Sequence, residues 1–196
     1  MNNCPFCKLD TSLFYNQILE ETNNFFIIPS LGALTEGYIL ILPKQHIYSM
    51  AKSNKKTLEE YNGIIEKYRK IFKKIYGRYP IVFEHGNPNP SCISANSIIH
   101  GHTHIVNHNY KNENEMINKL NFKRIDNFFD VESNKNYIYY KNQEGINYVT
   151  YEFEPISQIM RIYIANDLEI KDNYNWRNFA FNDNILKTIK KIKNNK

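Results

Sequence analysis

The sequence has few of the residues that mark linkers, and it lacks the segments that mark membrane or secreted proteins. Seven glycines and seven prolines in 196 residues are too few for a linker or a disordered chain. No apolar run approaches the roughly 18 residues that a membrane-spanning helix needs. The N-terminal stretch "MNNCPFCKLD" lacks the basic-then-apolar pattern of a secretion signal. We therefore expect a cytoplasmic protein that does not bind membranes and whose three cysteines are reduced.

Charge is also modest. The formal net charge is +5, and much of it lies in the C-terminal stretch "KTIKKIKNNK". Such a stretch is either a solvated helix end or a weak nucleic-acid contact, and scattered lysines favour the former. We expect no specific nucleic-acid partner. The length suits one core with added elements.

The apolar pattern predicts an α+β fold with a mostly antiparallel sheet. Apolar residues from Leu58 to Ile75 step by threes and fours, which indicates an amphipathic helix over 55–77 that ends at Gly77. We expect strands over 23–29, 37–44, 79–85 and 97–106, a hairpin over 136–153 and closing helices over 155–167 and 181–194. We divide the chain into a core, 1–110, and a C-terminal extension, 111–196, packed on the same domain.

Three histidines alternate with other residues in "NSIIHGHTHIVNH". If this run is a strand, His100, His102 and His104 share one face at spacings of about 6.5–7 Å. Polar rings buried without hydrogen bonds cost about 1–3 kcal/mol each. A solvated polar strand is one explanation, but metal binding and nucleophilic catalysis are the two chemical uses that we favour.

Cysteines near the N-terminus favour a metal site. Cys4 and Cys7 have the Cys-x-x-Cys spacing that lets two thiolates hold one ion. The same spacing is compatible with a redox pair, but no βαβ pattern follows it. His46 and His100 are available to complete a tetrahedral zinc site. The third cysteine, Cys92, is interpreted as incidental.

At these residues the chain resembles the histidine triad (HIT) superfamily of nucleotide hydrolases and transferases. "HGHTHIV" fits the triad signature, "CPFCKL" is similar to an N-terminal metal motif of bacterial members, and "GYILILPKQHI" is similar to one of their strands. The resemblance covers residues 4 to about 108 and implies a HIT-like fold. Gly101, Thr103 and Tyr38 depart from the usual residues at their positions.

The resemblance also implies roles for individual residues. His102 would be the nucleophile that attacks phosphorus, and His104 would contact the phosphate, offsetting its charge if protonated. Cys4, Cys7, His46 and His100 would hold a structural zinc ion. Ser97 would contact the phosphate or its leaving group, and Asn96 and Glu84 would lie at the rim of the nucleotide site. Phe26 or Ile28 would line the pocket for the nucleotide base.

Three functions remain open. The first is a nucleotide hydrolase that cleaves at the α-phosphate of a dinucleoside polyphosphate, a nucleoside phosphoramidate or a similar conjugate, through a nucleotidyl-histidine intermediate. The second is a nucleotidyl transferase or phosphorylase related to galactose-1-phosphate uridylyltransferase, and the third is a non-catalytic nucleotide-binding protein. His104 favours hydrolysis, because the transferase branch generally carries glutamine there.

The C-terminal extension resembles one seen in some bacterial members, and we expect it to cap or narrow the nucleotide cleft. Gln158 and Arg161 lie three apart and would either bind a polyphosphate or form a surface polar pair. Trp176, the sole tryptophan, would be a core residue or a base-stacking one. A homodimer through the long helix and a sheet edge is implied by the resemblance alone.

Overall fold

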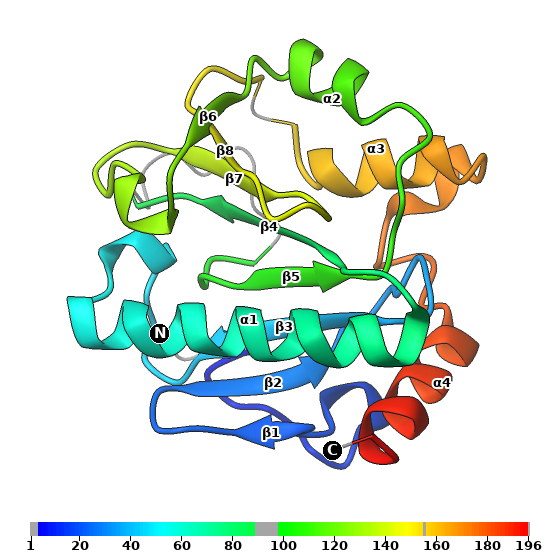
Figure 1. Ribbon diagram of the computed structural model, residues 1–196. Coiled ribbons are helices and arrows are strands. Elements are labelled where there is room, and N and C mark those ends of the chain that lie inside the picture. Colours follow the sequence, from blue (N-terminus) through cyan, green and yellow to red (C-terminus); the bar gives the residue numbers. More distant parts are fainter. Residues whose placement is uncertain (1–3, 89–97, 155, 196) are drawn as a thin grey trace.

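One eight-stranded sheet organises the protein. The computed structural model describes residues 4–88, 98–154 and 156–195 (Figure 1). The strand order is β1-β2-β3-β5-β4-β7-β8-β6, and all neighbouring pairs are antiparallel, which confirms the expected α+β class. The strands are β1 (Glu20–Glu21), β2 (Phe25–Pro29), β3 (Tyr38–Pro43), β4 (Ile81–Gly86), β5 (Thr103–Val106), β6 (Lys123–Ile125), β7 (Tyr137–Lys141) and β8 (Asn147–Thr150). The α-helices are α1 (Lys55–Tyr76), α2 (Glu113–Lys119), α3 (Ile159–Asp167) and α4 (Asn182–Lys193), and single 3₁₀ turns are η1 (Phe14–Asn16), η2 (Met50–Lys52), η3 (Phe128–Asp130) and η4 (Lys171–Tyr174).

The long helix α1 forms where the apolar spacing predicts it. The Asn54 side chain accepts a hydrogen bond from the backbone N–H of Thr57, which satisfies one of the free donors at the start of the helix. Gly77 ends the helix with φ +73°, a left-handed conformation that glycine adopts without a steric cost. The buried stripe of the helix includes Tyr61, Tyr68 and Phe72, so tertiary packing on the sheet stabilises it.

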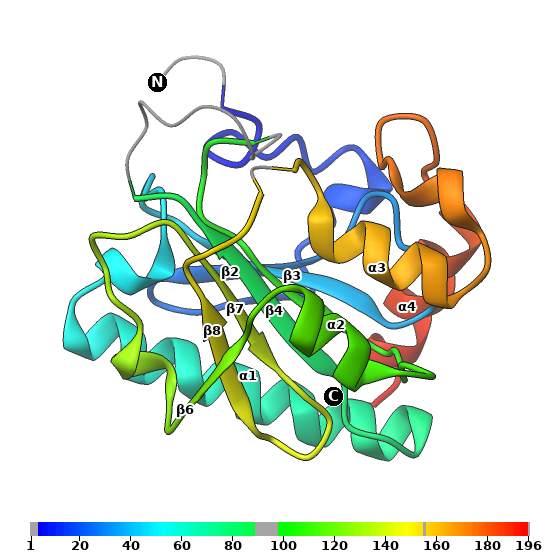
Figure 2. The same ribbon diagram turned by 90° about the horizontal axis from the view of Figure 1, so that it is seen from above.

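Strand register decides which side chains reach each face. Leu40 lies opposite His104 and Ile41 opposite Thr103, so the two faces of β5 carry His104 and Thr103 respectively. The Tyr61 hydroxyl of α1 lies 2.9 Å from Oγ1 of Thr103, which places α1 on the Thr103 face. Seen from above, α1 covers one side of the sheet, and the N-terminal segment and α3 lie on the other (Figure 2). His104 therefore projects to the side that α1 does not cover.

The central strand is shorter than the sequence predicts. We expected a strand over 97–106, but β5 comprises only Thr103–Val106, and residue 97 lies outside the described residues. Before Thr103 the chain bends, and the N–H of Gly101 donates to the carbonyl of Ile47 at 2.6 Å rather than to a neighbouring strand. The prediction that three histidines share one strand face was wrong for this reason. Only His104 lies in the strand.

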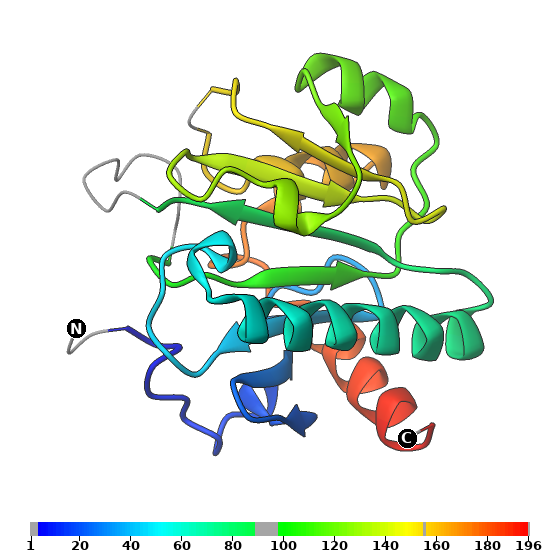
Figure 3. The ribbon, with the colours of Figure 1, turned by 60° about the vertical axis from the view of Figure 1, so that its left-hand side comes forward.

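The C-terminal extension continues the sheet. Strand β7 pairs with β4, and the hairpin turns at Asn142–Gly145 as predicted, with Gly145 at φ +87°. Helix α4 lies near the other end of the sheet, beside β2, β3 and α1 (Figure 3). The short elements β1, α2 and β6 were not predicted, because a few residues carry too little periodicity. Within the described residues, no helix is long and apolar enough to cross a membrane.

Candidate active site and metal centre

The His102 ring is held in one tautomer by the backbone. Its Nδ1 lies 2.7 Å from the carbonyl oxygen of His100, and a carbonyl only accepts, so Nδ1 carries the proton. The Nε2 atom then carries the lone pair. Burial lowers the pKa of His102 from its ordinary value, which keeps the ring neutral near pH 7. A backbone acceptor of this kind fixes the tautomer of a histidine and leaves its other ring nitrogen unprotonated.

His104 is neutral as well, in contrast to the protonated ring considered from the sequence. Burial lowers its pKa well below the ordinary histidine value, and the neighbouring His102 and Arg161 lower it further. Its ring stacks on Phe83 with the centroids 4.4 Å apart, and its Nδ1 lies 3.0 Å from the Tyr38 hydroxyl. Because Arg161 beside that phenol can only donate, we assign the phenol as donor to Nδ1. His104 then presents Nε2–H, a neutral donor.

The N-terminal loop contacts both the nucleophile candidate and the metal candidates. Phe6 lies between Cys4 and Cys7 in the sequence, and its ring meets His102 edge-on at 5.3 Å and His100 at 5.8 Å between centroids. The His102 and His104 centroids are 4.9 Å apart. Phe6 was not singled out in the sequence, because a single apolar residue between two cysteines gives no signal.

A cavity of about 310 Å³ opens over the two catalytic candidates. We name it the histidine cavity. Its walls combine the N-terminal segment, the sheet and the C-terminal extension, and its lining includes Phe6, Tyr15, Ile28, Leu40, His102, His104, Arg161 and Trp176. The lining is largely apolar with a smaller number of polar groups, as in sites that bind small molecules. Ile28 lines it as expected, whereas Phe26 does not and lies under the Lys44 ammonium.

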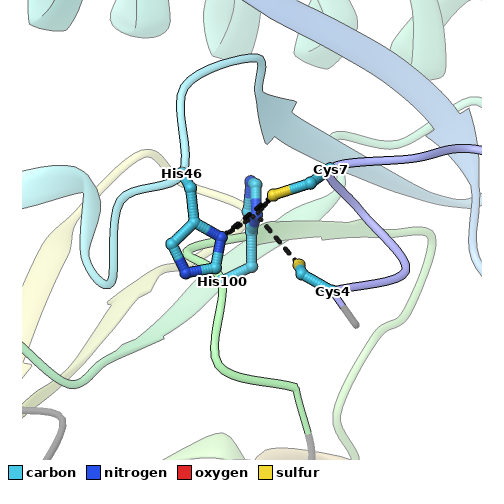
Figure 4. A group of neighbouring side chains, drawn as sticks. All are labelled: Cys4, Cys7, His46 and His100. Carbon is cyan, nitrogen blue, oxygen red and sulfur yellow. Dashed lines mark hydrogen bonds between the residues drawn. The ribbon is translucent and has the colours of Figure 1, made fainter. Parts of the chain in front are cut away.

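Four side chains form a second group beside this cavity. Cys4, Cys7, His46 and His100 offer one ligand atom each, and these atoms all lie within 4.8 Å of one another (Figure 4). The Nε2 atom of His100 lies 2.9 Å from the carbonyl of Pro43, so Nε2–H donates there and Nδ1 turns its lone pair toward the sulfurs. Burial lowers the pKa of His100 to about 4, which keeps it neutral, as metal ligation requires.

Four of the six spacings among these atoms are close to those around a tetrahedral ion. A zinc ion bound at ordinary lengths sets its ligand atoms about 3.4 Å apart for two nitrogens and about 3.6 Å apart for nitrogen and sulfur. The two Nδ1 atoms are 3.2 Å apart, and the Nδ1 of His100 lies 3.4 Å from Sγ of Cys4 and 3.5 Å from Sγ of Cys7. The Nδ1 of His46 lies closer to Sγ of Cys7, at 3.0 Å. The donor set is therefore suited to one zinc ion.

Glu84 lies elsewhere than predicted. It is fully buried on the Thr103 face, away from the histidine cavity, and its carboxylate accepts hydrogen bonds from Met50 N–H at 2.8 Å and the Tyr137 hydroxyl at 2.6 Å. The prediction that Glu84 borders the nucleotide site is corrected, because strand alternation turns it to the opposite face. Its bonds hold the loop that carries His46. Ser97 and Asn96 lie outside the described residues.

Gln158 and Arg161 brace a loop rather than forming a surface pair. Gln158 does not line the histidine cavity; its amide exchanges hydrogen bonds with Asn175 and the backbone N–H of Trp176, both at 3.3 Å. Arg161 is buried, donates from Nε to the Tyr174 carbonyl at 2.9 Å and from Nη2 to the Gly32 carbonyl at 2.6 Å, and lines the cavity. The C-terminal extension thus supplies Arg161 and Trp176 to the cavity wall, as expected of a segment that narrows it.

Comparison of this sequence with known protein families identifies one family that matches. Residues 3–120, more than half of the chain, match the family described as "Scavenger mRNA decapping enzyme C-term binding", a HIT-like family. No curated protein sequence matches the chain.

Solved structures of several HIT proteins are also similar. A HIT family member from Bacillus subtilis is 19% identical, with a TM-score of 0.44 over 53% of this chain and 72% of that one. A zinc-bound histidine triad family protein from Mycobacterium smegmatis is 16% identical, with a TM-score of 0.45 over 57% and 79% of the two chains. A HIT family protein from Bacillus anthracis is 17% identical, with a TM-score of 0.47 over 57% and 77%. The sequence match, rather than these distant similarities, carries the family assignment.

Proposed function

This chain belongs to the scavenger mRNA decapping enzyme C-terminal family of the histidine triad superfamily, and on that premise we propose that it is a nucleotide hydrolase. Its substrate would be a dinucleoside polyphosphate, a nucleoside phosphoramidate or a similar conjugate, cleaved at the α-phosphate. The observation that carries the proposal is the Nδ1–H of His102 donating to the His100 carbonyl, which leaves Nε2 as a lone-pair nucleophile in a lined cavity.

The proposed reaction has two displacements. In the first, Nε2 of His102 attacks the α-phosphorus, the bond from phosphorus to the leaving oxygen or nitrogen breaks, and the leaving group takes a proton from water. In the second, water attacks the same phosphorus, the phosphorus–nitrogen bond breaks and the nucleoside monophosphate leaves. Splitting one hard displacement into two easier ones is the gain from covalent catalysis.

His104 would stabilise the charge that builds on the phosphoryl oxygens. As a neutral ring with Nε2–H free for substrate and Nδ1 held by Tyr38, it donates a hydrogen bond without adding net charge. Arg161 lines the same cavity, with its guanidinium 5.5 Å from the centre of the Tyr38 ring, and adds positive potential near His104. Ser97 and Asn96 remain proposed phosphate contacts.

Zinc is the proposed occupant of the group formed by Cys4, Cys7, His46 and His100. Held by four protein ligands, zinc would supply structural cross-linking and no open coordination position. These ligands join the N-terminal loop, the segment after β3 and the bend before β5, which are three of the pieces that surround His102. The metal centre would thereby position Phe6 and the triad.

Product analysis tests hydrolysis against transfer. We propose incubation with diadenosine tetraphosphate and with a cap dinucleotide, each with and without inorganic phosphate. Hydrolysis of diadenosine tetraphosphate gives AMP and ATP in either condition, whereas ADP and ATP that require added phosphate would indicate phosphorolysis. Adenosine phosphoramidate, tested in the same buffer, extends the panel to P–N bonds.

Trapping the intermediate tests His102 directly. Rapid acid-free quenching and peptide mass spectrometry should find a nucleotidyl group on His102, because phosphorus–nitrogen bonds break in acid. The His102→Asn variant should lose at least about 10³-fold in kcat while still binding AMP, as Trp176 fluorescence would report. An adduct on another residue, or a His102→Asn variant with the wild-type rate, would contradict the proposal. If the zinc-loaded wild type turned over none of the nucleotides in the panel, the result would favour the non-catalytic nucleotide-binding function.

The homodimer stays a proposal that rests on the resemblance, and the cytoplasmic location stays a proposal that rests on the sequence pattern. A dimer would use the long helix α1 and a sheet edge. Light scattering across a range of protein concentrations tests the dimer, and fractionation of the source cells tests the location.

A further inference from the structure

A second concavity lies on the opposite face of the sheet from the histidine cavity. It has a volume of about 580 Å³ and forms between the C-terminal half of α1 and the turn that joins β7 to β8. It shares no lining residue with the histidine cavity. We name it the Arg69 pocket, after the residue at its base.

Arg69 is a buried cation with no carboxylate in hydrogen-bonding range. It is 4% exposed, and its Nη1 donates to the carbonyls of Pro80 and Asn142, both at 2.9 Å, while Nη2 donates to that of Gln143 at 2.9 Å. The nearest acidic oxygen, Oε1 of Glu66, is 4.0 Å from Nε. Within the described residues Nε–H donates no hydrogen bond. Backbone carbonyls therefore supply the hydrogen bonds that this buried cation makes, Glu66 adds only a long ion pair, and the Nε–H is left for an anion.

Further cations surround Arg69 at the base of the pocket. Lys70, Lys73, Arg78 and Lys141 line the pocket with Arg69, against only two acidic residues, Glu66 and Glu144. The Glu66 carboxylate is engaged by Lys141, with Nζ to Oε1 at 2.6 Å. The pocket therefore holds an excess of positive charge within a confined volume, which concentrates anions.

Tyr79 and Gly145 shape the entrance. The Tyr79 ring is 40% exposed and lies 5.1 Å from the Arg69 guanidinium and 5.5 Å from the Lys73 ammonium, so both cations are held against it. Gly145 brings bare backbone close to the guanidinium, because even a Cβ built there would lie 3.5 Å from Nη2 of Arg69. At the Gly145 position, therefore, no side chain of the turn stands between an anion and Arg69.

We propose that the Arg69 pocket binds a small phosphate-bearing anion, independently of the histidine cavity. A guanidinium edge matches two phosphate oxygens, and flexible lysines accommodate further phosphates. The ligand chemistry is a chain of phosphates, which free polyphosphate or the phosphate chain of a nucleotide could supply. This inference does not depend on the proposed hydrolase activity.

Titration of the full chain with sodium tripolyphosphate tests the proposal. Two-dimensional NMR should show shifts at the Gly145 amide and the Tyr79 ring, neither of which lines the histidine cavity, and these shifts should saturate at millimolar ligand or below. The double variant Lys70→Gln with Lys73→Gln should weaken this binding at least tenfold, about 1.4 kcal/mol. The control, Lys56→Gln with Lys74→Gln, removes the same charge from α1 at positions outside the pocket and should bind as the wild type does.

Two results would overturn the proposal. One is the absence of local shifts with tripolyphosphate and inorganic phosphate at 10 mM. The other is equal weakening in the pocket variant and the control, which would indicate general charge attraction. A parallel arm uses single-stranded RNA: binding through Lys70 and Lys73 with no response to small phosphates would reject the small-anion site. Because Arg69→Gln removes three hydrogen bonds to backbone and risks unfolding, the lysine variants carry the test.

Discussion

The hydroxyl of Tyr38 lies 3.0 Å from Nδ1 of His104, across the pair of strands β3 and β5. Burial raises the pKa of this phenol, so it keeps its proton and can donate to the imidazole. The contact fixes which nitrogen of His104 faces the cavity. We therefore propose Tyr38 as a positioning residue that acts through His104.

Removal of the Tyr38 hydroxyl should slow turnover without abolishing it. In Tyr38→Phe the His104 ring loses its fixed tautomer, and we expect kcat/KM to fall about five- to tenfold, near the worth of one net hydrogen bond. Steady-state kinetics measures the fall, and ¹⁵N NMR of His104 reports the tautomer. The matched control is Tyr61→Phe, which removes a buried hydroxyl 2.9 Å from Thr103 on the other face of β5. An unchanged His104 tautomer in Tyr38→Phe would contradict the assigned role.

Zinc should be bound in about one equivalent and should stabilise the fold. Cys4→Ser removes one thiolate ligand, so we expect loss of the metal by elemental analysis together with a lower unfolding temperature. Cys92→Ser is the control, since it makes the same substitution outside the proposed ligand set. A metal-free wild type as stable as the metal-loaded protein would reject the structural role.

Glu84 should make stability depend on pH. Burial raises its pKa from 4.5 to about 7, so its contribution to stability is fully present below pH 4.5 and is lost as the pH rises through about 7. Glu84→Gln stays neutral throughout. The free energy of unfolding of the variant relative to the wild type should therefore grow by up to about 3 kcal/mol between pH 4.5 and 9. Urea unfolding at several pH values measures this difference, and parallel curves would show that Glu84 does not titrate in this range.

Gly32 should not tolerate a side chain. It has φ +74°, and a Cβ there would lie 2.5 Å from Cβ and 2.8 Å from Cα of Trp176. Gly32→Ala should therefore lower the free energy of unfolding by more than about 1 kcal/mol and displace the only tryptophan, seen as a shift in its emission. Gly63→Ala is the opposite case, because nothing lies within 4 Å of its Cβ position in α1. It should stabilise the helix by about 0.5–1 kcal/mol. Equal effects of the two substitutions would refute the close packing of Trp176 on Gly32.

Long elements with a regular pattern could be predicted from the sequence, and short or bent ones could not. Helix α1 and the hairpin of β7 and β8 carry clear periodicity and turn residues, and the structure has both. The sequence predicts a regular strand over 97–106, but the strand in the structure begins only at Thr103, because the chain bends before it. There, His100 joins Cys4, Cys7 and His46, and such long-range convergence leaves no mark on local alternation.

The sequence by itself determined the chemistry available to this protein: two thiolates, a set of imidazoles and a spacing that resembles one superfamily, along with the α+β class. Only the tertiary structure decided which atom of each ring is free and which side chains share a wall. It turned Glu84 away from the cavity because strand residues alternate faces, and it brought Arg161 and Trp176 from the C-terminal extension to the cavity that holds His102 and His104. The contact of Tyr38 with His104 and the hydrogen bond of Arg161 to Gly32 join segments far apart in the chain, and no local pattern encodes them.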